Sequence, residues 1–259
     1  MKLIDTHCHI YVEDFDSDRD ELISASRDFG ITALFLPNID RSSVNRLHEL
    51  CDRYPDYCFP MMGLHPTSVG SDYVAELLYL ESLLSGRSYS GIGEIGIDLY
   101  WDKTFLKEQL VVFEEQLRWS IACSLPVSIH TRNAFPEVFE VIHKVGPEKL
   151  KGIFHSFSGT VADAREILSF GNFKLGINGI VTYKNSDLPE VLKQTVTIRD
   201  LVIETDAPYL SPVPFRGKRN QPVYLREIAL KIAEIFNLPI EVVTEELEKK
   251  SRKIFATIC

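Results

Sequence analysis

The stretch Leu3-Ile4-Asp5-Thr6-His7-Cys8-His9 opens with an apolar run and ends in two histidines one residue apart. Alternate side chains of a β-strand point to the same face, so a strand here would aim both imidazoles to one side and Cys8 to the other. We therefore predict a strand at residues 3–7 whose end offers His7 and His9 as metal ligands, with Cys8 in the core. The pair alone is a weak signal, because two nearby histidines also occur by chance.

Short apolar runs of this kind recur along the chain and alternate with segments of helical spacing, such as 106–121 and 225–235. We expect strands near residues 3–7, 31–36, 58–62, 89–93, 127–130, 152–155, 173–175 and 201–203. Eight strand and helix alternations predict an α/β fold, a parallel (β/α)8 or TIM barrel. With 259 residues, 45% of them hydrophobic, the chain fits a single barrel domain over 1–259, with the last helix at 240–254 as an outer brace.

Four later strand-like runs are each followed at once by an acid or an imidazole, in the order Glu94, His130, His155 and Asp206. The loops after the carboxyl ends of the strands build the active site of a TIM barrel. The recurrence therefore predicts that these four side chains and the first histidine pair meet at one mouth of the barrel.

Four imidazoles and two carboxylates suit two divalent cations, for which Zn, Mg and Mn are all candidates. We assign His7, His9 and Asp206 to one cation, His130 and His155 to the other, and Glu94 as the bridge between them. Asp206 and Glu94 are the expected catalytic residues, with Asp206 taking the proton of the attacking water. Glu204 shares strand parity with Asp206, so it either orients a ligand or forms a buried ion pair elsewhere.

Four further residues are candidate phosphate contacts: His65, Arg132, Arg216 and Lys218. Each has an ordinary alternative, namely a turn histidine before proline, an exposed rim arginine, or a solvated basic loop at 214–220. Tyr100 or Trp101 could stack on bases, although packing under a loop is the more common role for such aromatics.

Several function classes are disfavoured. The formal net charge of −9 argues against a broad grip on duplex DNA, and no apolar run is long enough to cross a membrane. The pattern Gly91-Ile92-Gly93-Glu94-Ile95-Gly96 is not followed by a helix, so it is not read as a dinucleotide site. Five scattered cysteines and a charged start without an apolar signal region favour a cytoplasmic protein, and no obligate protein partner is predicted.

Together, the motifs resemble the TatD family of metal-dependent hydrolases across essentially the whole chain. The resemblance rests on His7-Cys8-His9, Gly63-Leu64-His65-Pro66, Gly93-Glu94-Ile95-Gly96-Ile97-Asp98, His130-Thr131-Arg132, Phe154-His155-Ser156-Phe157-Ser158-Gly159, Glu204-Thr205-Asp206-Ala207-Pro208-Tyr209 and Arg216-Gly217-Lys218-Arg219-Asn220. It implies an amidohydrolase-superfamily barrel that acts as a deoxyribonuclease on DNA or oligonucleotide ends in the 3′ to 5′ direction. It also implies that the six expected ligands are the family's metal-binding positions.

Two other functions are compatible with these residues. The same pair of cations could hydrolyse a small amide, ester or lactone, or the protein could be a metal-binding scaffold with little turnover.

Overall fold

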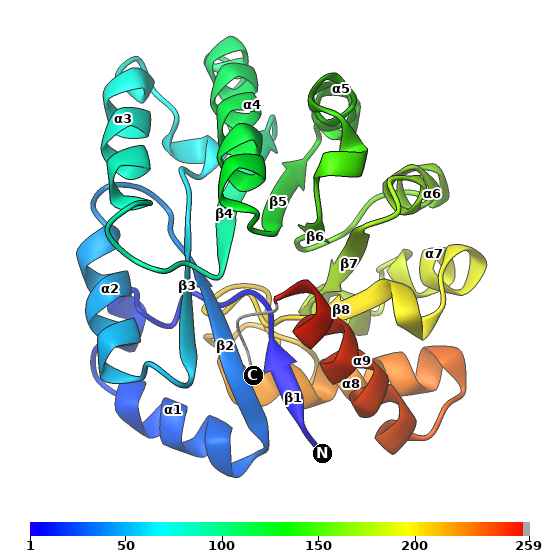
Figure 1. Cartoon of the computed structure of the whole chain (residues 1–259). Helices are drawn as coiled ribbons and strands as arrows, with labels where there is room; N and C mark the ends of the chain where they lie inside the picture. The colour runs from blue at the N-terminus through cyan, green and yellow to red at the C-terminus, as the bar shows by residue number, and fades with distance from the viewer. Residues whose placement is uncertain (256–259) are drawn as a thin grey trace.

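The computed structural model describes residues 1–255, and its eight strands form one parallel sheet in the order β1 to β8. The strands are β1 Leu3–Asp5, β2 Ile31–Pro37, β3 Cys58–Met62, β4 Gly91–Asp98, β5 Val127–Arg132, β6 Gly152–Phe154, β7 Phe173–Ile177 and β8 Leu201–Ile203. The helices are α1 Arg19–Asp28, α2 Val44–Arg53, α3 Tyr73–Leu83, α4 Leu106–Cys123, α5 Phe135–Val145, α6 Val161–Ser169, α7 Leu188–Thr195, α8 Leu225–Phe236 and α9 Ile240–Ile254. The helices surround the strands, as Figure 1 shows, so the predicted TIM barrel is confirmed.

The seam between β8 and β1 is closed by hydrogen bonds outside the regular strand pairing. The Thr6 amide donates to the Ile203 carbonyl at 3.2 Å, and the Asp206 amide donates to the His7 carbonyl at 2.9 Å. These bonds bring the segment after β1 beside the segment after β8. Two groups of candidate ligands, nearly two hundred residues apart in sequence, therefore lie together.

The hydrophobic core has two parts, because strand side chains alternate between the barrel interior and the surrounding helices. Buried side chains that face the helices form the larger part. The smaller part fills the interior and includes Ile4, Phe35, Val202 and Phe255. Phe255 stacks on Phe35 with a centroid distance of 4.1 Å, so the end of α9 closes the interior in addition to bracing the barrel from outside.

Two predicted strand ends are wrong in a way that matters for the site. β1 ends at Asp5, so His7 and His9 lie in the following loop and not on the strand or at its last residue. β4 continues to Asp98 because it stays paired with β5 as far as Arg132, which places Glu94 inside the strand. The glycine pattern at 91–96 thus belongs to a strand, in agreement with the rejection of a dinucleotide site.

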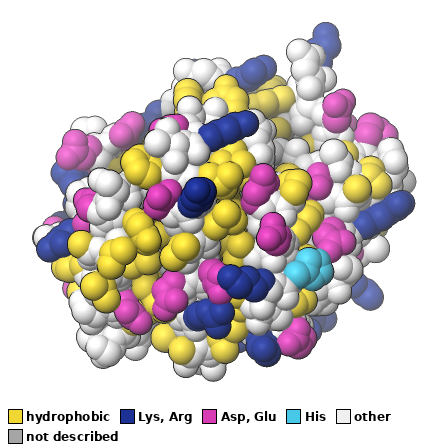
Figure 2. All heavy atoms as spheres, turned by 90° about the horizontal axis from the view of Figure 1, so that it is seen from above, with side chains coloured by type: hydrophobic (Ala, Val, Ile, Leu, Met, Phe, Trp, Pro, Cys, Tyr) yellow, Lys and Arg dark blue, Asp and Glu magenta, His cyan; other side chains and the backbone are white. Residues whose placement is uncertain are grey.

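Four of the five cysteines and the charged side chains of one face can be located in the structure. Cys8, Cys51 and Cys58 are buried and Cys123 is exposed, all as free thiols, while Cys259 lies outside the described residues. On the side that is uppermost in Figure 1, acidic and basic side chains are intermixed and form no continuous basic surface (Figure 2). Among the described helices, none has the length and apolarity needed to span a bilayer.

Candidate metal centre

The six expected ligands converge at the carboxyl ends of the strands. A cavity of about 610 Å³ opens there, and His9, Glu94, His130, His155 and Asp206 line it. His7 lies behind them, fully buried, with its ring stacked on that of His155 at a centroid distance of 3.4 Å. The structure therefore brings together all six side chains that the sequence singled out.

A bulge in β4 positions Glu94. The register against β5 shifts between Ile92 and Ile95, so an extra residue interrupts the alternation at this point. The strand then passes so close to β5 that a Cβ at Gly96, whose φ is +143°, would overlap the carbonyl of His130. These local features place the Glu94 carboxylate among the imidazoles.

The two oxygens of Glu94 face different imidazoles. Oε2 lies 3.1 Å from Nε2 of His7 and 3.4 Å from Nε2 of His9. Oε1 lies 2.8 Å from Nδ1 of His130 and 3.6 Å from Nε2 of His155. One oxygen of Glu94 thus faces His7 and His9 and the other faces His130 and His155, so Glu94 would reach a cation on either side.

Asp206 places its carboxylate beside three of the imidazoles. Its Oδ1 lies 3.9 Å from Nε2 of His7, 3.8 Å from Nε2 of His9 and 3.6 Å from Nε2 of His155. The residue has a φ of +58°, a left-handed conformation that aspartate tolerates better than most side chains. This turn directs the carboxylate back over the mouth immediately after β8.

The donor set fits divalent cations. Ligands held at 2.0–2.1 Å around a tetrahedral zinc ion are separated from one another by about 3.3 Å. Nε2 of His7, Nε2 of His9 and Oε2 of Glu94 lie 3.1 to 3.4 Å from one another, and Asp206 Oδ1 lies 3.9 and 3.8 Å from the same two ring nitrogens. His7, His9 and Glu94 are therefore arranged as ligands around a common centre, with Asp206 beside the two imidazoles.

In each imidazole, one ring nitrogen faces the candidate centre and the other contacts a neighbouring side chain. Nδ1 of His7 lies 3.0 Å from Ser128 Oγ, Nδ1 of His9 lies 3.2 Å from Tyr11 Oη, and Nε2 of His130 lies 2.9 Å from Asp98 Oδ2. Nδ1 of His155 lies 2.8 Å from Glu204 Oε1 as an ion-pair contact that is not aligned as a hydrogen bond. Such partners fix the orientation of metal-binding histidines.

Burial and charge shift the pKa values of the centre in different directions. Burial raises the pKa of Asp206 to about 6. Burial also opposes the charged form of His155, but the carboxylates of Glu204, Asp206 and Glu94 outweigh it and raise the pKa of His155 to about 10. For Glu94 the effect of burial is overcome by the surrounding imidazoles, foremost His65, which lower its pKa.

Asp5 ties the two loops of the seam together. Its carboxylate is fully buried and accepts hydrogen bonds from the Thr205 amide at 2.9 Å, the Thr205 hydroxyl at 2.5 Å and the His7 amide at 3.4 Å. Burial raises the pKa of Asp5 to about 7. The backbones next to two expected ligands, His7 and Asp206, are thereby anchored to one side chain.

Comparison with known proteins decides the family. Residues 4–256 match the family described as TatD related DNase. The chain belongs to the TatD family. A Bacillus subtilis (strain 168) relative named uncharacterized metal-dependent hydrolase YabD is 32% identical over 253 residues, covering 98% of both chains. A Pantoea ananatis relative named 3′-5′ ssDNA/RNA exonuclease TatD is 28% identical over 251 residues, covering 94% of this chain and 95% of that protein.

A solved TatD homolog has the same fold. The crystal structure of YJJV from Escherichia coli K12 superposes with a TM-score of 0.89 at 26% identity, and the match covers 98% of each chain. This TatD-family chain is accordingly a metal-dependent hydrolase, in agreement with the donor set described above.

The predicted phosphate contacts of this TatD-family enzyme divide into two groups. His65 and Arg132 line the cavity, and Nε2 of His65 lies 3.4 Å from Glu94 Oε1, close enough to join the ligands. Arg216 and Lys218 are not among the lining residues, and the Arg216 guanidinium lies over the Tyr183 ring at 4.5 Å. The structure therefore does not place the basic loop at the centre.

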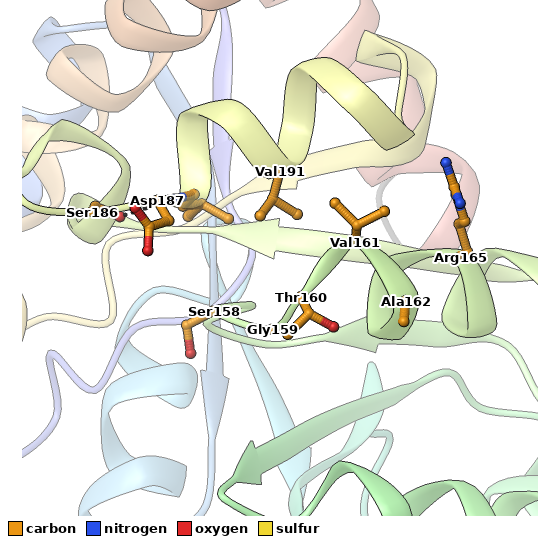
Figure 3. A pocket seen from close by; sticks show the side chains of 10 residues that line it. Ser158, Gly159, Thr160, Val161, Ala162, Arg165, Ser186, Asp187 and Val191 are labelled. Carbon is orange, nitrogen blue, oxygen red and sulfur yellow. Dashed lines mark hydrogen bonds between the residues drawn. The ribbon is translucent and has the colours of Figure 1, made fainter.

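A second cavity of the TatD-family barrel, of about 660 Å³, lies between α6 and α7. Figure 3 shows Val161 of α6 and Val191 of α7 facing each other across it. Ser158 borders both this cavity and the one at the centre. The residues that line the cavity between α6 and α7 include no histidine. The candidate ligands are therefore gathered at the cavity that Glu94 lines.

Proposed function

We propose that this hydrolase cleaves phosphodiester bonds at the 3′ ends of DNA, with two divalent cations bound between its histidines and carboxylates. The division of the Glu94 oxygens between two sets of imidazoles is the observation that carries this proposal. The name of the Pantoea ananatis relative supports the choice of nucleic acid as substrate and of the 3′ to 5′ direction.

The proposed ligands keep the assignment made from the sequence. His7, His9 and Asp206 would hold one cation, His130 and His155 would hold the other, and Glu94 would be shared between them. Nε2 of His65 lies 3.4 Å from Glu94 Oε1, so His65 is a further candidate ligand for the cation beside His130. Cations bound there would neutralise the phosphate and acidify a water molecule for in-line attack.

The protein's own groups supply the remaining steps. Asp206 lines the cavity with its Oδ1 3.8 Å from Nε2 of His9, where it can accept the proton of the attacking water. Arg132, exposed at the end of β5, can donate to phosphate oxygens with its planar guanidinium. Ser128, Tyr11 and Asp98 hold the imidazoles in place through the contacts described above.

The charge distribution favours binding of the end of a DNA strand over extended binding along a DNA duplex. The net charge is −9, and the cations of the basic loop lie away from the lining of the cavity. The free thiols of the buried cysteines support our prediction of a cytoplasmic location.

The proposal is tested with purified protein that is stripped with a chelator and reloaded with Mn²⁺, Mg²⁺ or Zn²⁺. On a 5′-labelled single-stranded oligonucleotide we expect stepwise shortening from the 3′ end. Asp206→Asn should lower kcat roughly 10²-fold to 10⁴-fold, as loss of a general base does. Glu94→Gln should abolish turnover, whereas Glu140→Gln, which changes an exposed carboxylate on α5, should leave it intact.

Activity that survives both Glu94→Gln and Asp206→Asn would reject this centre. Hydrolysis of a lactone or carboxylic ester by the reloaded protein, without any cleavage of oligonucleotide, would reject the nuclease assignment while retaining the metal centre.

A further inference from the structure

Two neighbouring aromatic residues follow β4 at the rim of the catalytic cavity. Tyr100 is 52% exposed and Trp101 is 73% exposed, and their rings meet edge to face at a centroid distance of 4.8 Å. A tryptophan usually buries most of its large apolar surface. Exposure of Trp101 beside a catalytic centre therefore calls for a ligand that covers it.

Arg132 distinguishes the two rings. Its guanidinium carbon lies 3.8 Å from the centroid of Tyr100 and 5.4 Å from that of Trp101. The guanidinium therefore lies closest to the Tyr100 ring. Trp101 lines the cavity and remains largely exposed. Arg132 is exposed, and the nearby Asp98 carboxylate is engaged with His130 at 2.9 Å, so the guanidinium can meet a phosphate.

We propose that Trp101 is the platform on which the terminal base of an unpaired 3′ end stacks, while Tyr100 holds Arg132 ready for a phosphate of the same strand. This assignment rests on the proposed function and names the residue that selects the substrate. Arg132 is the last residue of β5 and pairs with Asp98, the last residue of β4, and Tyr100 and Trp101 lie in the loop that begins there.

The arrangement favours single strands for a physical reason. A base in a duplex is already paired and stacked, so it can reach Trp101 only after that stacking is lost. Moving an unpaired terminal base away from its neighbours costs little free energy. Any base can then stack on an aromatic ring, because every base has a π-face. Trp101 thus favours single-stranded over double-stranded ends and does not distinguish among base sequences.

The test compares two single-stranded oligonucleotides of equal length, one with an ordinary 3′-terminal nucleotide and one whose terminal nucleotide lacks the base. Metal-loaded wild-type protein, Trp101→Ala, Trp101→Phe and Phe29→Ala are assayed for kcat and KM in removing the terminal nucleotide. Phe29 is a matched control, because it is 56% exposed but precedes β2 at the opposite end of the barrel.

We expect Trp101→Ala to raise KM for the ordinary end about tenfold with little change in kcat, and to leave KM for the baseless end unchanged. Trp101→Phe should recover most of the affinity, and Phe29→Ala should behave as wild type. Tyr100→Ala should raise KM for both ends by a similar factor, because it releases the guanidinium that meets the phosphate.

A Trp101→Ala variant that loses affinity equally for both ends, or for neither, would overturn the role of Trp101. A wild-type protein that cleaves neither oligonucleotide with any of the three metals would instead reject the proposed function, so the two failures are distinguishable.

Discussion

At the scale of single residues, the candidate centre depends on how each imidazole is oriented. A ring that is free to rotate would lose conformational freedom on binding a cation, whereas a ring already held through its second nitrogen has lost it on folding. His130 is the clearest case, because Glu94 holds its Nδ1 and Asp98 holds its Nε2. Asp98 is therefore an orienting residue.

This role yields a prediction for Asp98→Ala. Loss of the carboxylate frees Nε2 of His130 and leaves the Tyr100 amide without its acceptor. We expect metal affinity to fall roughly 10-fold to 100-fold at one of two sites. Calorimetric titration of the chelator-stripped protein with Mn²⁺ measures this change. Asp102→Ala is the control, since Asp102 accepts hydrogen bonds from Thr104 on the same loop; equal affinities in both variants would contradict the role of Asp98.

Sequence reasoning missed the residues that orient the imidazoles, for two different reasons. Asp98 has the strand parity of Glu94, two alternations further on, and could have been found if the strand had been extended past Gly93. Ser128 and Tyr11 carry no such signal, because their importance depends on which ring nitrogen they meet after folding. The expected ligands were predictable because each lies in or shortly after an apolar, strand-like run.

At the scale of elements, charge density along the sequence did not reveal where a loop would point. The loop after β8 carries Arg216 and Lys218, but it folds against neighbouring loops: the Tyr183 hydroxyl donates to the Ser211 carbonyl, and Arg219 pairs with Asp18. Those contacts depend on tertiary packing, which a local cluster of cations cannot encode. Positions on the strand ends were predictable because the barrel itself fixes them.

The short turn before β8 gives an element-scale prediction about pH. In this turn, Ile198–Asp200, the Asp200 carboxylate accepts hydrogen bonds from the amide and hydroxyl of Thr197. Burial opposes its charge, but these bonds and Lys174 outweigh burial and lower its pKa below 3.8. A depressed pKa means that the charged form stabilises the fold above about pH 4 and that this stabilisation is lost as the pH falls further.

We expect Asp200→Ala to lower the free energy of unfolding by about 1 kcal/mol at pH 7, as loss of a capping residue does. The difference from wild type should shrink as the pH falls below 3.8. Urea unfolding at pH 7, 5 and 3 measures it. A difference that stays constant over this range would show that the carboxylate charge contributes nothing.

At the scale of the whole molecule, the barrel converts sequence separation into proximity. The candidate ligands extend from His7 to Asp206, and the hydrogen bonds across the β8 and β1 seam bring the two ends of that span together. The acidic net charge and the position of the candidate ligands around the cavity restrict strong contacts with a polyanion to the mouth. The account as a whole therefore depends on two cations bound on either side of Glu94.

The most direct test is an anomalous diffraction measurement on crystals of the Mn²⁺-loaded protein. We predict two peaks about 3.5–4 Å apart, one beside Glu94 Oε2 with His7 and His9, the other beside Glu94 Oε1 with His130 and His155. A single peak, or peaks outside the cavity that Glu94 lines, would contradict the proposed centre.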